Sequence, residues 1–277
     1  MHATPFPKQV RIENTNLCNA RCTICPREKL TRRKGVMGLD LFRKIVAECA
    51  AGGVEEVHLE GFGEPFLDKE IFEKIRYAKE RGIPRTFLVT NASLLTEERA
   101  KALIASGLDR MKVSFYGVNK QEYERIHRNL KYEEVRDNVR RLARLRKESG
   151  SRTPRIETKY IGVWTRYPKF FLQWAGHTGV VFHRLHNYGT GRQFVRVKAR
   201  ARARKCPMVT RPIMQILWTG EVVPCCYDFN GEMILGNAAE SSLKEIWLGD
   251  AYLRFREIHK LQEFAKLPYC MRCDKLR

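Results

Sequence analysis

The feature that most constrains the fold of this chain is a regular alternation of strand-like and helix-like segments. Strand-like stretches of alternating or continuous apolar residues lie at 9–15, 54–59, 85–90, 110–115, 155–161 and 180–186. Segments with helical spacing lie between them, at 39–51, 68–81, 96–107, 120–127, 133–148 and 167–175. Alternation of this kind predicts an α/β fold in which parallel strands are joined by crossover helices.

One side of nearly every predicted strand is polar. The polar positions are Arg11 with Glu13, His58 with Glu60, Lys112 with Ser114, Glu157 with Lys159, and Arg184 with His186. A sheet covered by helices on both faces should have near-continuous apolar strands. We therefore favour an open barrel with a polar lumen over a doubly wound sheet. The alternative is that some of these charges lie at strand ends, in solvent.

Three cysteines follow the first predicted strand as Cys18-x3-Cys22-x2-Cys25. A structural zinc site needs a fourth Cys or His nearby, and the next twenty residues supply basic side chains instead. A cubane held by three cysteines leaves one iron without a protein ligand. A metal with an open coordination position can bind a reacting molecule, as catalytic zinc does and fully coordinated structural zinc does not.

This motif resembles the signature of the radical S-adenosylmethionine (SAM) superfamily. The resemblance implies a [4Fe-4S] cluster on Cys18, Cys22 and Cys25, with the open iron bound by SAM. It implies that SAM is reductively cleaved to a 5′-deoxyadenosyl radical, which abstracts hydrogen from a substrate. It also implies a partial (β/α)6 TIM-like barrel over residues 8–190.

A second motif of that family follows the second predicted strand, as Gly61-Phe62-Gly63-Glu64-Pro65. The related turn in the family binds the SAM amino group, and glycine permits the close backbone approach. Phe62 replaces a glycine there, and Ile24 stands where the family often has an aromatic residue against adenine. By resemblance, the expected SAM contacts are Ile24, Phe62, Gly63, Glu64, Asn91 and Ser114. Asn91 and Ser114 end predicted strands, where ligand-binding side chains collect, although Asn91 is also an ordinary turn residue.

Five more cysteines lie after residue 205: Cys206, Cys225, Cys226, Cys270 and Cys273. Residues 213–218 and 221–223 flank Thr219-Gly220 as a hairpin would, and residues 241–248 and 251–259 have helical spacing. Cysteines gathered from a hairpin and a C-terminal loop make a closed site. On the residues alone, this site suits zinc or a cubane.

The spacing Cys206-x13-Gly220-x4-Cys225 with a distal Cys270-x2-Cys273 resembles the SPASM/twitch extension of radical SAM enzymes. The resemblance implies an auxiliary [4Fe-4S] cluster on Cys206, Cys225, Cys270 and Cys273. It also implies a small cysteine-rich hairpin-plus-helix domain at residues 206–277, after a basic linker at 191–205. We expect Cys49, on a helix face, to lie in the core.

The formal net charge is +21 among 277 residues. The charge is spread along the chain, so a generally positive surface is the simplest interpretation, and an anionic partner is the alternative. No stretch reaches the ~18 apolar residues of a membrane span, and the N-terminus has no apolar signal core. We therefore expect a cytoplasmic protein without a membrane span. In a cytoplasmic protein, nine cysteines favour metal-binding or redox roles over disulfide bonds.

By resemblance, twitch-type enzymes of this length are similar to dehydrogenases of aminocyclitols or sugars. That predicts a radical SAM oxidoreductase that oxidises an alcohol carbon of a small polar molecule, such as a sugar, an aminocyclitol or a phosphorylated, anionic metabolite. The auxiliary cluster would accept an electron, and a flavodoxin, ferredoxin or reductase would be the electron donor. The reaction needs a base, for which the candidates are His58, Glu60, Glu157, Lys159 and His186.

Two alternatives remain open from the sequence. The same radical chemistry serves peptide or protein side-chain modification, or epimerisation. An alternative from a different functional class is a basic nucleic-acid-binding protein whose cysteines form structural metal sites. That class explains the charge but not the turn at Gly63-Glu64-Pro65, so we do not expect nucleic acid as a partner.

Overall fold

The computed structural model describes residues 5–183, 185, 206, 209 and 211–273. The candidate base His186, the predicted linker at 191–205 and the boundaries predicted on either side of it lie outside the described residues.

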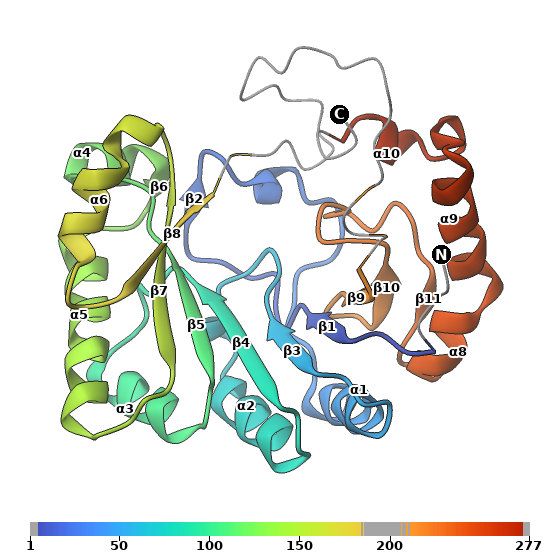
Figure 1. Cartoon of the computed structure of the whole chain (residues 1–277), viewed down its shortest axis with the longest axis horizontal. Coiled ribbons are helices and arrows are strands. Elements are labelled where there is room, and N and C mark those ends of the chain that lie inside the picture. The colour runs from blue at the N-terminus through green and yellow to red at the C-terminus, as the bar shows by residue number, and fades with distance from the viewer. Residues whose placement is uncertain (1–4, 184, 186–205, 207–208, 210, 274–277) are drawn as a thin grey trace.

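One nine-stranded sheet organises the described part of the chain, in the order β11-β10-β9-β1-β3-β4-β5-β7-β8 (Figure 1). Its strands are β1 Gln9–Ile12, β3 Glu56–Leu59, β4 Arg85–Thr90, β5 Arg110–Ser114, β7 Arg155–Ile161, β8 Gly179–His183, β9 Ile213–Ile216, β10 Glu221–Val223 and β11 Gly236–Asn237. From β1 to β8, each strand pairs in parallel with the next. The predicted parallel α/β arrangement is therefore confirmed.

Helices connect these parallel strands and lie along the outer side of the curved sheet (Figure 1). They are α1 Leu39–Ala51, α2 Ile71–Glu80, α3 Glu97–Ala105, α4 Lys120–Ile126, α5 Tyr132–Glu148 and α6 Tyr167–Trp174. Their ends follow local chemistry. Thr96 caps α3 by accepting a hydrogen bond from the Arg99 N–H, and α1 stops at Gly52, before Gly53 with φ +69°. No helix in the described part is long and apolar enough to cross a membrane.

The two faces of the barrel wall differ as the strand pattern predicts. The helix-covered face carries apolar side chains that are at most 2% exposed: Val10, Ile12, Val57, Leu59, Met111, Val113 and Ile156. Cys49 on α1 joins this core, as expected. The alternate strand positions line a cavity inside the barrel, so the predicted polar lumen is present.

The hairpin β9–β10 continues the barrel sheet. Strand β9 pairs in parallel with β1, with Val10 opposite Met214 and Ile12 opposite Ile216. The hairpin turns at Gly220, whose φ of +95° suits glycine. This pairing satisfies the N–H and C=O groups that β1 would otherwise leave open at an edge. Helices α8 Leu243–Leu248 and α9 Asp250–Leu261 follow, beside the hairpin (Figure 1).

Candidate active site in the barrel lumen

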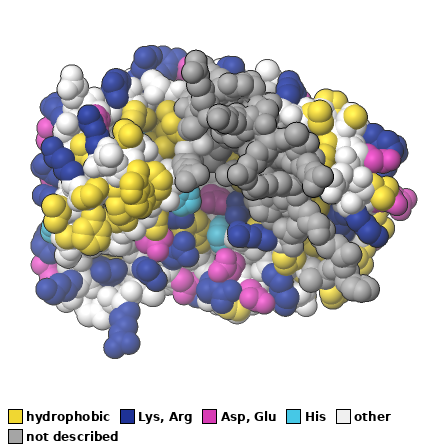
Figure 2. Space-filling view, turned by 45° about the horizontal axis from the view of Figure 1, so that its top comes forward, with side chains coloured by type: hydrophobic (Ala, Val, Ile, Leu, Met, Phe, Trp, Pro, Cys, Tyr) yellow, Lys and Arg dark blue, Asp and Glu magenta, His cyan; other side chains and the backbone are white. Residues whose placement is uncertain are grey.

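A cavity of about 780 Å³ occupies the lumen, and both groups of cysteines contribute to its wall. Figure 2 shows charged and histidine side chains gathered in the hollow at the centre of the molecule. The predicted site residues that line this cavity are Cys18, Cys22, Ile24, Cys25, His58, Glu60, Phe62, Gly63, Glu64, Asn91, Ser114, Lys159 and Cys225. The fold therefore brings most of the predicted site together.

The cysteine loop is held by a small second sheet. Strand β2 (Arg21–Cys22) pairs antiparallel with β6 (His127–Arg128), which places Cys22 opposite His127. The Thr23 N–H donates to the Ile126 carbonyl at 2.9 Å, and the Cys25 N–H donates to the Cys22 carbonyl at 3.1 Å. The three sulfurs consequently lie on one short, pinned loop at the edge of the lumen.

His127 is a site residue that the sequence did not indicate. Its ring is buried between Tyr116 and Tyr123, with ring centroids 4.7 and 4.5 Å away. The Tyr116 N–H donates to Nε2 at 3.1 Å, so Nδ1 carries the proton of the neutral ring. Nδ1 lies 3.2 Å from Cys22 Sγ and can donate to that sulfur. Burial lowers the pKa of His127 to about 3, which keeps the ring neutral.

The three thiols of the loop are all partly buried. Burial raises the pKa of Cys18, and burial with the neighbouring Cys25 and Cys18 thiols raises the pKa of Cys22. The pKa of Cys25 rises to about 11, chiefly through burial. Thiolates are the form that binds metal, so a bound cation is what would hold these sulfurs ionised.

The glycine turn packs directly on the cysteine loop. A Cβ at Gly63 would come within 2.2 Å of the Thr15 carbonyl oxygen, so only glycine fits there. The next residue, Glu64, is 1% exposed and accepts hydrogen bonds from the Thr90 hydroxyl at 2.6 Å and the Asn91 N–H at 2.7 Å. Burial outweighs these bonds and raises the pKa of Glu64 to about 7.

Asn91 joins the turn to the cysteine loop. Its side-chain amide donates to Asn19 Oδ1 at 3.0 Å and lies 4.0 Å from Cys18 Sγ. The end of β4 therefore fixes both the Glu64 carboxylate and the start of the cysteine motif. Asn91 has more than an ordinary turn role in this structure.

A buried ion pair that the sequence did not indicate links three parts of the site. Both carboxylate oxygens of Glu13 accept hydrogen bonds from Arg32 at 2.7 Å, and one accepts from the Phe62 N–H at 3.2 Å. Arg32 also donates to the Phe229 carbonyl at 2.6 Å. The pair thus connects the end of β1, the segment after the cysteines and the segment after β10.

Ion pairs line the lumen below the cysteine loop. Arg11 Nη1 lies 3.2 Å from Glu60 Oε1, and His58 lies 2.9 Å from Glu56 and 3.7 Å from Glu60. Burial alone would raise the pKa of Glu60, but His58 and Arg11 lower it to about 2. Glu60 is therefore ionised, with His58 held between two carboxylates.

The remaining candidate bases lie in different settings. Glu157 is 5% exposed, forms ion pairs with Arg110 at 3.2 Å and Arg155 at 3.5 Å, and does not line the cavity. Burial lowers the pKa of Lys159, but the Tyr116 phenol and then Glu60 raise it by more, so the net shift is upward. His183 lines the cavity although the sequence did not single it out.

The C-terminal cysteines form a second group. The pKa of Cys225 is raised by burial and then by Cys226 and Cys273. The pKa of Cys270 is raised to about 12 by burial and then by Cys206 and Cys273. Cys226 instead faces Arg11, whose Nη1 lies 3.5 Å from its sulfur. Electrostatic interactions thus connect the four predicted ligands, and both Cys225 and Cys226 line the lumen.

The spacing of these sulfurs bears on the kind of metal they fit. Within the described residues, no three His, Cys, Asp or Glu side chains gather closely enough to hold a single metal ion. A cubane places its cysteine ligands on separate irons, so their sulfurs stand further apart than those around one zinc. The donor atoms of both groups are thiol sulfurs, which fit an iron–sulfur cluster.

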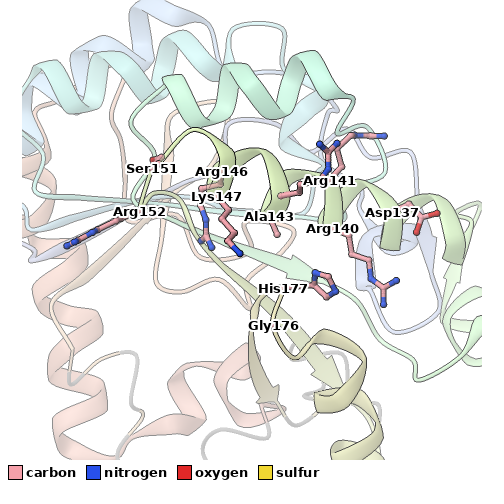
Figure 3. Close-up of a pocket in the computed structure, with 12 residues that line it drawn as sticks. Asp137, Arg140, Arg141, Ala143, Arg146, Lys147, Ser151, Arg152, Gly176 and His177 are labelled. Atoms are coloured by element: carbon pink, nitrogen blue, oxygen red, sulfur yellow. The ribbon is translucent and has the colours of Figure 1, made fainter.

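Another hollow, of about 980 Å³, lies on the outside of the molecule (Figure 3). The end of α5 and the turn at Gly176 and His177 form it, and basic residues such as Arg140 and Lys147 line it. None of the predicted site residues borders this outer groove.

Comparison with known proteins places these features in a family. Residues 12–154, just over half of the chain, match the model of the radical SAM superfamily, and residues 206–274 match the model of SPASM, an iron–sulfur cluster-binding domain. These two domains imply iron–sulfur clusters and SAM as cofactors.

Similar proteins span nearly the whole chain. A cofactor-modifying protein of a tungsten-containing aldehyde ferredoxin oxidoreductase from Pyrococcus furiosus is 23% identical, over 96% of this chain and 87% of its own. An S-adenosyl-L-methionine-dependent 2-deoxy-scyllo-inosamine dehydrogenase from Niallia circulans is 22% identical, over 96% of this chain and 92% of its own.

A solved structure shares the fold. The crystal structure of BtrN in complex with AdoMet and 2-DOIA superposes with a TM-score of 0.67 at 21% identity, over 97% of this chain and 93% of that one. The partial TIM-like barrel with a cysteine-rich C-terminal region is thereby confirmed. The chain belongs to the radical SAM superfamily, as an enzyme with a C-terminal SPASM domain.

Proposed function

We propose that this enzyme oxidises an alcohol carbon of a small polar molecule, such as a sugar, an aminocyclitol or a phosphorylated metabolite. The observation that carries the proposal is that the first cysteine group and, from the second, Cys225 and Cys226 line one polar cavity. A substrate in that cavity would lie between the place where hydrogen is abstracted and a place that can accept an electron. The Niallia circulans relative, a dehydrogenase of similar length, supports this direction.

We assign the cluster that binds SAM to Cys18, Cys22 and Cys25, and the auxiliary cluster to Cys206, Cys225, Cys270 and Cys273. Bound SAM would supply the 5′-deoxyadenosyl radical, and the auxiliary cluster would supply an acceptor for one electron. Alcohol oxidation then balances as one hydrogen atom, one proton and one electron removed from the substrate. An external flavodoxin, ferredoxin or reductase would provide the electron that starts SAM cleavage.

The chain must hold SAM and exclude water from it. We assign contacts with SAM to the backbone of Gly63, to the carboxylate of Glu64 and to Asn91, with Ile24, Phe62 and Ser114 completing the wall. The tight packing of Gly63 against Thr15 supports this role, because it fixes the turn against the cysteine loop.

We assign the proton-accepting role to His58. Its imidazole lines the lumen, and histidine is the side chain most often used as a general base. Glu60, with a pKa of about 2, is a weak base, and Lys159 is held as the ammonium. The flanking carboxylates of Glu56 and Glu60 would stabilise the imidazolium that His58 becomes.

Anaerobic reconstitution tests the cofactor assignments. The wild-type chain should bind about eight irons, as two cubanes require. Replacement of Cys18, Cys22 and Cys25 by alanine should remove about half of that iron and abolish 5′-deoxyadenosine formation. The control Cys49→Ala alters a cysteine in the core, away from both groups, and should keep the full iron content. Zinc at both sites, or SAM cleavage by the triple variant, would refute the assignment.

Product analysis tests the reaction. The reconstituted enzyme should be offered amino sugars, sugar phosphates, nucleotides and peptides, with 5′-deoxyadenosine measured for each. The proposal expects a product oxidised by two electrons, and that product should be lost in His58→Gln. A product no more oxidised than its substrate, with reductant consumed at each turnover, would contradict it. Such a product would indicate epimerisation, and turnover of peptides alone would indicate side-chain modification.

A further inference from the structure

Two lysines face the lumen side by side. Lys112 lies on β5 and Lys159 on β7, and the register pairs Lys112 with Glu157 and Ser114 with Lys159. The two lysines are therefore two residues apart in the register, on the same face of adjacent parallel strands. Both are half-buried and line the cavity.

These lysines differ from the other cations on the barrel strands. Arg11 has Glu60 at 3.2 Å, and Arg110 has Glu157 at 3.2 Å. Within the described part of the chain, Lys112 and Lys159 have no carboxylate within 4.0 Å. Aromatic rings lie beside them instead, with Lys112 Nζ 5.0 Å from the Phe87 ring centroid and Lys159 Nζ 5.4 Å from that of Tyr116.

Placing two ammonium groups together in a cavity is unfavourable unless something compensates. Burial, Lys159 and Arg110 lower the pKa of Lys112 by more than Glu60 and Glu157 raise it. The pKa of Lys159 is raised, so its charge persists. Glu60 and Glu157 act on Lys112 only from beyond ion-pair distance, so an anion that accepts hydrogen bonds from both lysines would offset the repulsion more directly.

We propose that Lys112 and Lys159 form an anion subsite that binds a phosphate or carboxylate group of the substrate within the lumen. This rests on the proposed function and narrows its substrate class to molecules that carry such a group. Neither lysine then acts as the base, which agrees with the assignment of that role to His58.

A carboxylate could also come from SAM. Lys159 lies nearer the C-terminal ends of the strands, whereas Lys112 lies two residues further toward their N-terminal ends. A subsite that includes Lys112 therefore extends below the place expected for SAM. The experiment must separate the two sources.

Inorganic phosphate is the probe, titrated calorimetrically into the iron-loaded wild-type protein with and without SAM. The wild type should bind phosphate at one saturable site, and should do so in the presence of SAM. Lys112→Met and Lys159→Met should each weaken binding by about tenfold or more, the effect of losing one charged hydrogen bond. Lys112→Arg keeps the charge and should bind more tightly than Lys112→Met.

Lys147→Met is the matched control, because Lys147 is an exposed lysine in the outer basic groove (Figure 3). It should bind phosphate as the wild type does. Equal weakening in this control, or no saturable binding by folded wild-type protein, would overturn the subsite. Displacement of phosphate by SAM, with weaker SAM binding in both methionine variants, would assign the lysines to SAM and overturn the substrate proposal. Formation of a product oxidised by two electrons by the wild-type enzyme, measured separately, decides whether the proposed function itself holds.

Discussion

His127 Nδ1 lies 3.2 Å from Cys22 Sγ, with the ring oriented by the Tyr116 N–H at its other nitrogen. The C-terminal cysteines show a parallel arrangement, in which His259 Nε2 lies 3.6 Å from Cys270 Sγ. Hydrogen bonds to ligand sulfurs are one of the means by which a protein sets the reduction potential of a cluster.

Removal of the His127 donor should therefore make the SAM-binding cluster harder to reduce. His127→Phe keeps an aromatic ring between Tyr116 and Tyr123 but loses the N–H that faces Cys22. A donor stabilises the more electron-rich reduced cluster, so we expect a more negative potential in spectroscopic redox titration. His177→Phe, at the outer groove, is the control and should leave the potential unchanged. An unaltered potential in a fully iron-loaded His127→Phe would contradict this role.

The affinity for SAM should depend on pH through Glu64. The pKa of this carboxyl is about 7, so it is largely protonated below that pH and ionised above it. The SAM ammonium favours the ionised form, so binding below pH 7 must release a proton. We expect affinity to fall by up to about tenfold per pH unit below pH 7.

Calorimetric titration of SAM into the reconstituted protein, between about pH 6 and 8 around the Glu64 pKa, measures this dependence. Glu64→Gln should bind SAM more weakly and with little pH dependence, because the amide does not titrate. A wild-type affinity that stays level across this range would remove Glu64 from the contact.

Gly63→Ala should damage the turn itself. The added Cβ would meet the Thr15 carbonyl at 2.2 Å and the Leu17 carbonyl at 2.8 Å, and backbone atoms cannot move aside as a flexible side chain can. We expect weaker SAM binding and a lower midpoint of thermal unfolding. Gly179→Ala on β8 is the matched control, because its Cβ would make an ordinary 3.5 Å contact with Glu157. Similar behaviour of the two variants would show that the close approach is unimportant.

Arg32→Met should destabilise the protein strongly. It would leave the Glu13 carboxylate buried without its counter-charge, and loss of one partner of a buried pair costs about 3–5 kcal/mol in the free energy of unfolding. The pair is nearly inaccessible, with side chains 11% and 0% exposed. Lys101→Met removes an exposed pair with Glu97 and should change stability little. Equal thermal midpoints for these two variants would argue against the buried pair as a structural link.

Adjacent cysteines should differ in iron binding. Cys225→Ser should lose about four of the expected eight irons, because we assign Cys225 to the auxiliary cluster. Cys226→Ser should keep them, since Cys226 faces Arg11 rather than Cys270 and Cys273. Iron analysis of the two variants decides between the neighbours. Loss of iron from Cys226→Ser alone would exchange their roles.

The sequence by itself determined the order of the elements and the composition of the two cysteine groups. Strand and helix periodicity is local, so α1 at Leu39–Ala51, β4 at Arg85–Thr90 and β7 at Arg155–Ile161 have the predicted bounds. Cysteine spacing is also a local feature of the sequence, and it was sufficient to indicate the radical SAM superfamily. Alternation of apolar and polar residues gave the polar lumen, because side chains point to opposite faces of a strand.

Only the tertiary structure decided which distant residues meet. His127 reaches Cys22 across 105 positions through the β2–β6 pairing, and Arg32 reaches Glu13 in the interior. It also placed β9 against β1, and brought Lys112 and Lys159 to the same face of adjacent strands. The reason is that apolar periodicity fixes which face of an element is buried, whereas register and strand order fix the neighbours. Many strands share the same pattern, so their pairing depends on packing over the whole fold.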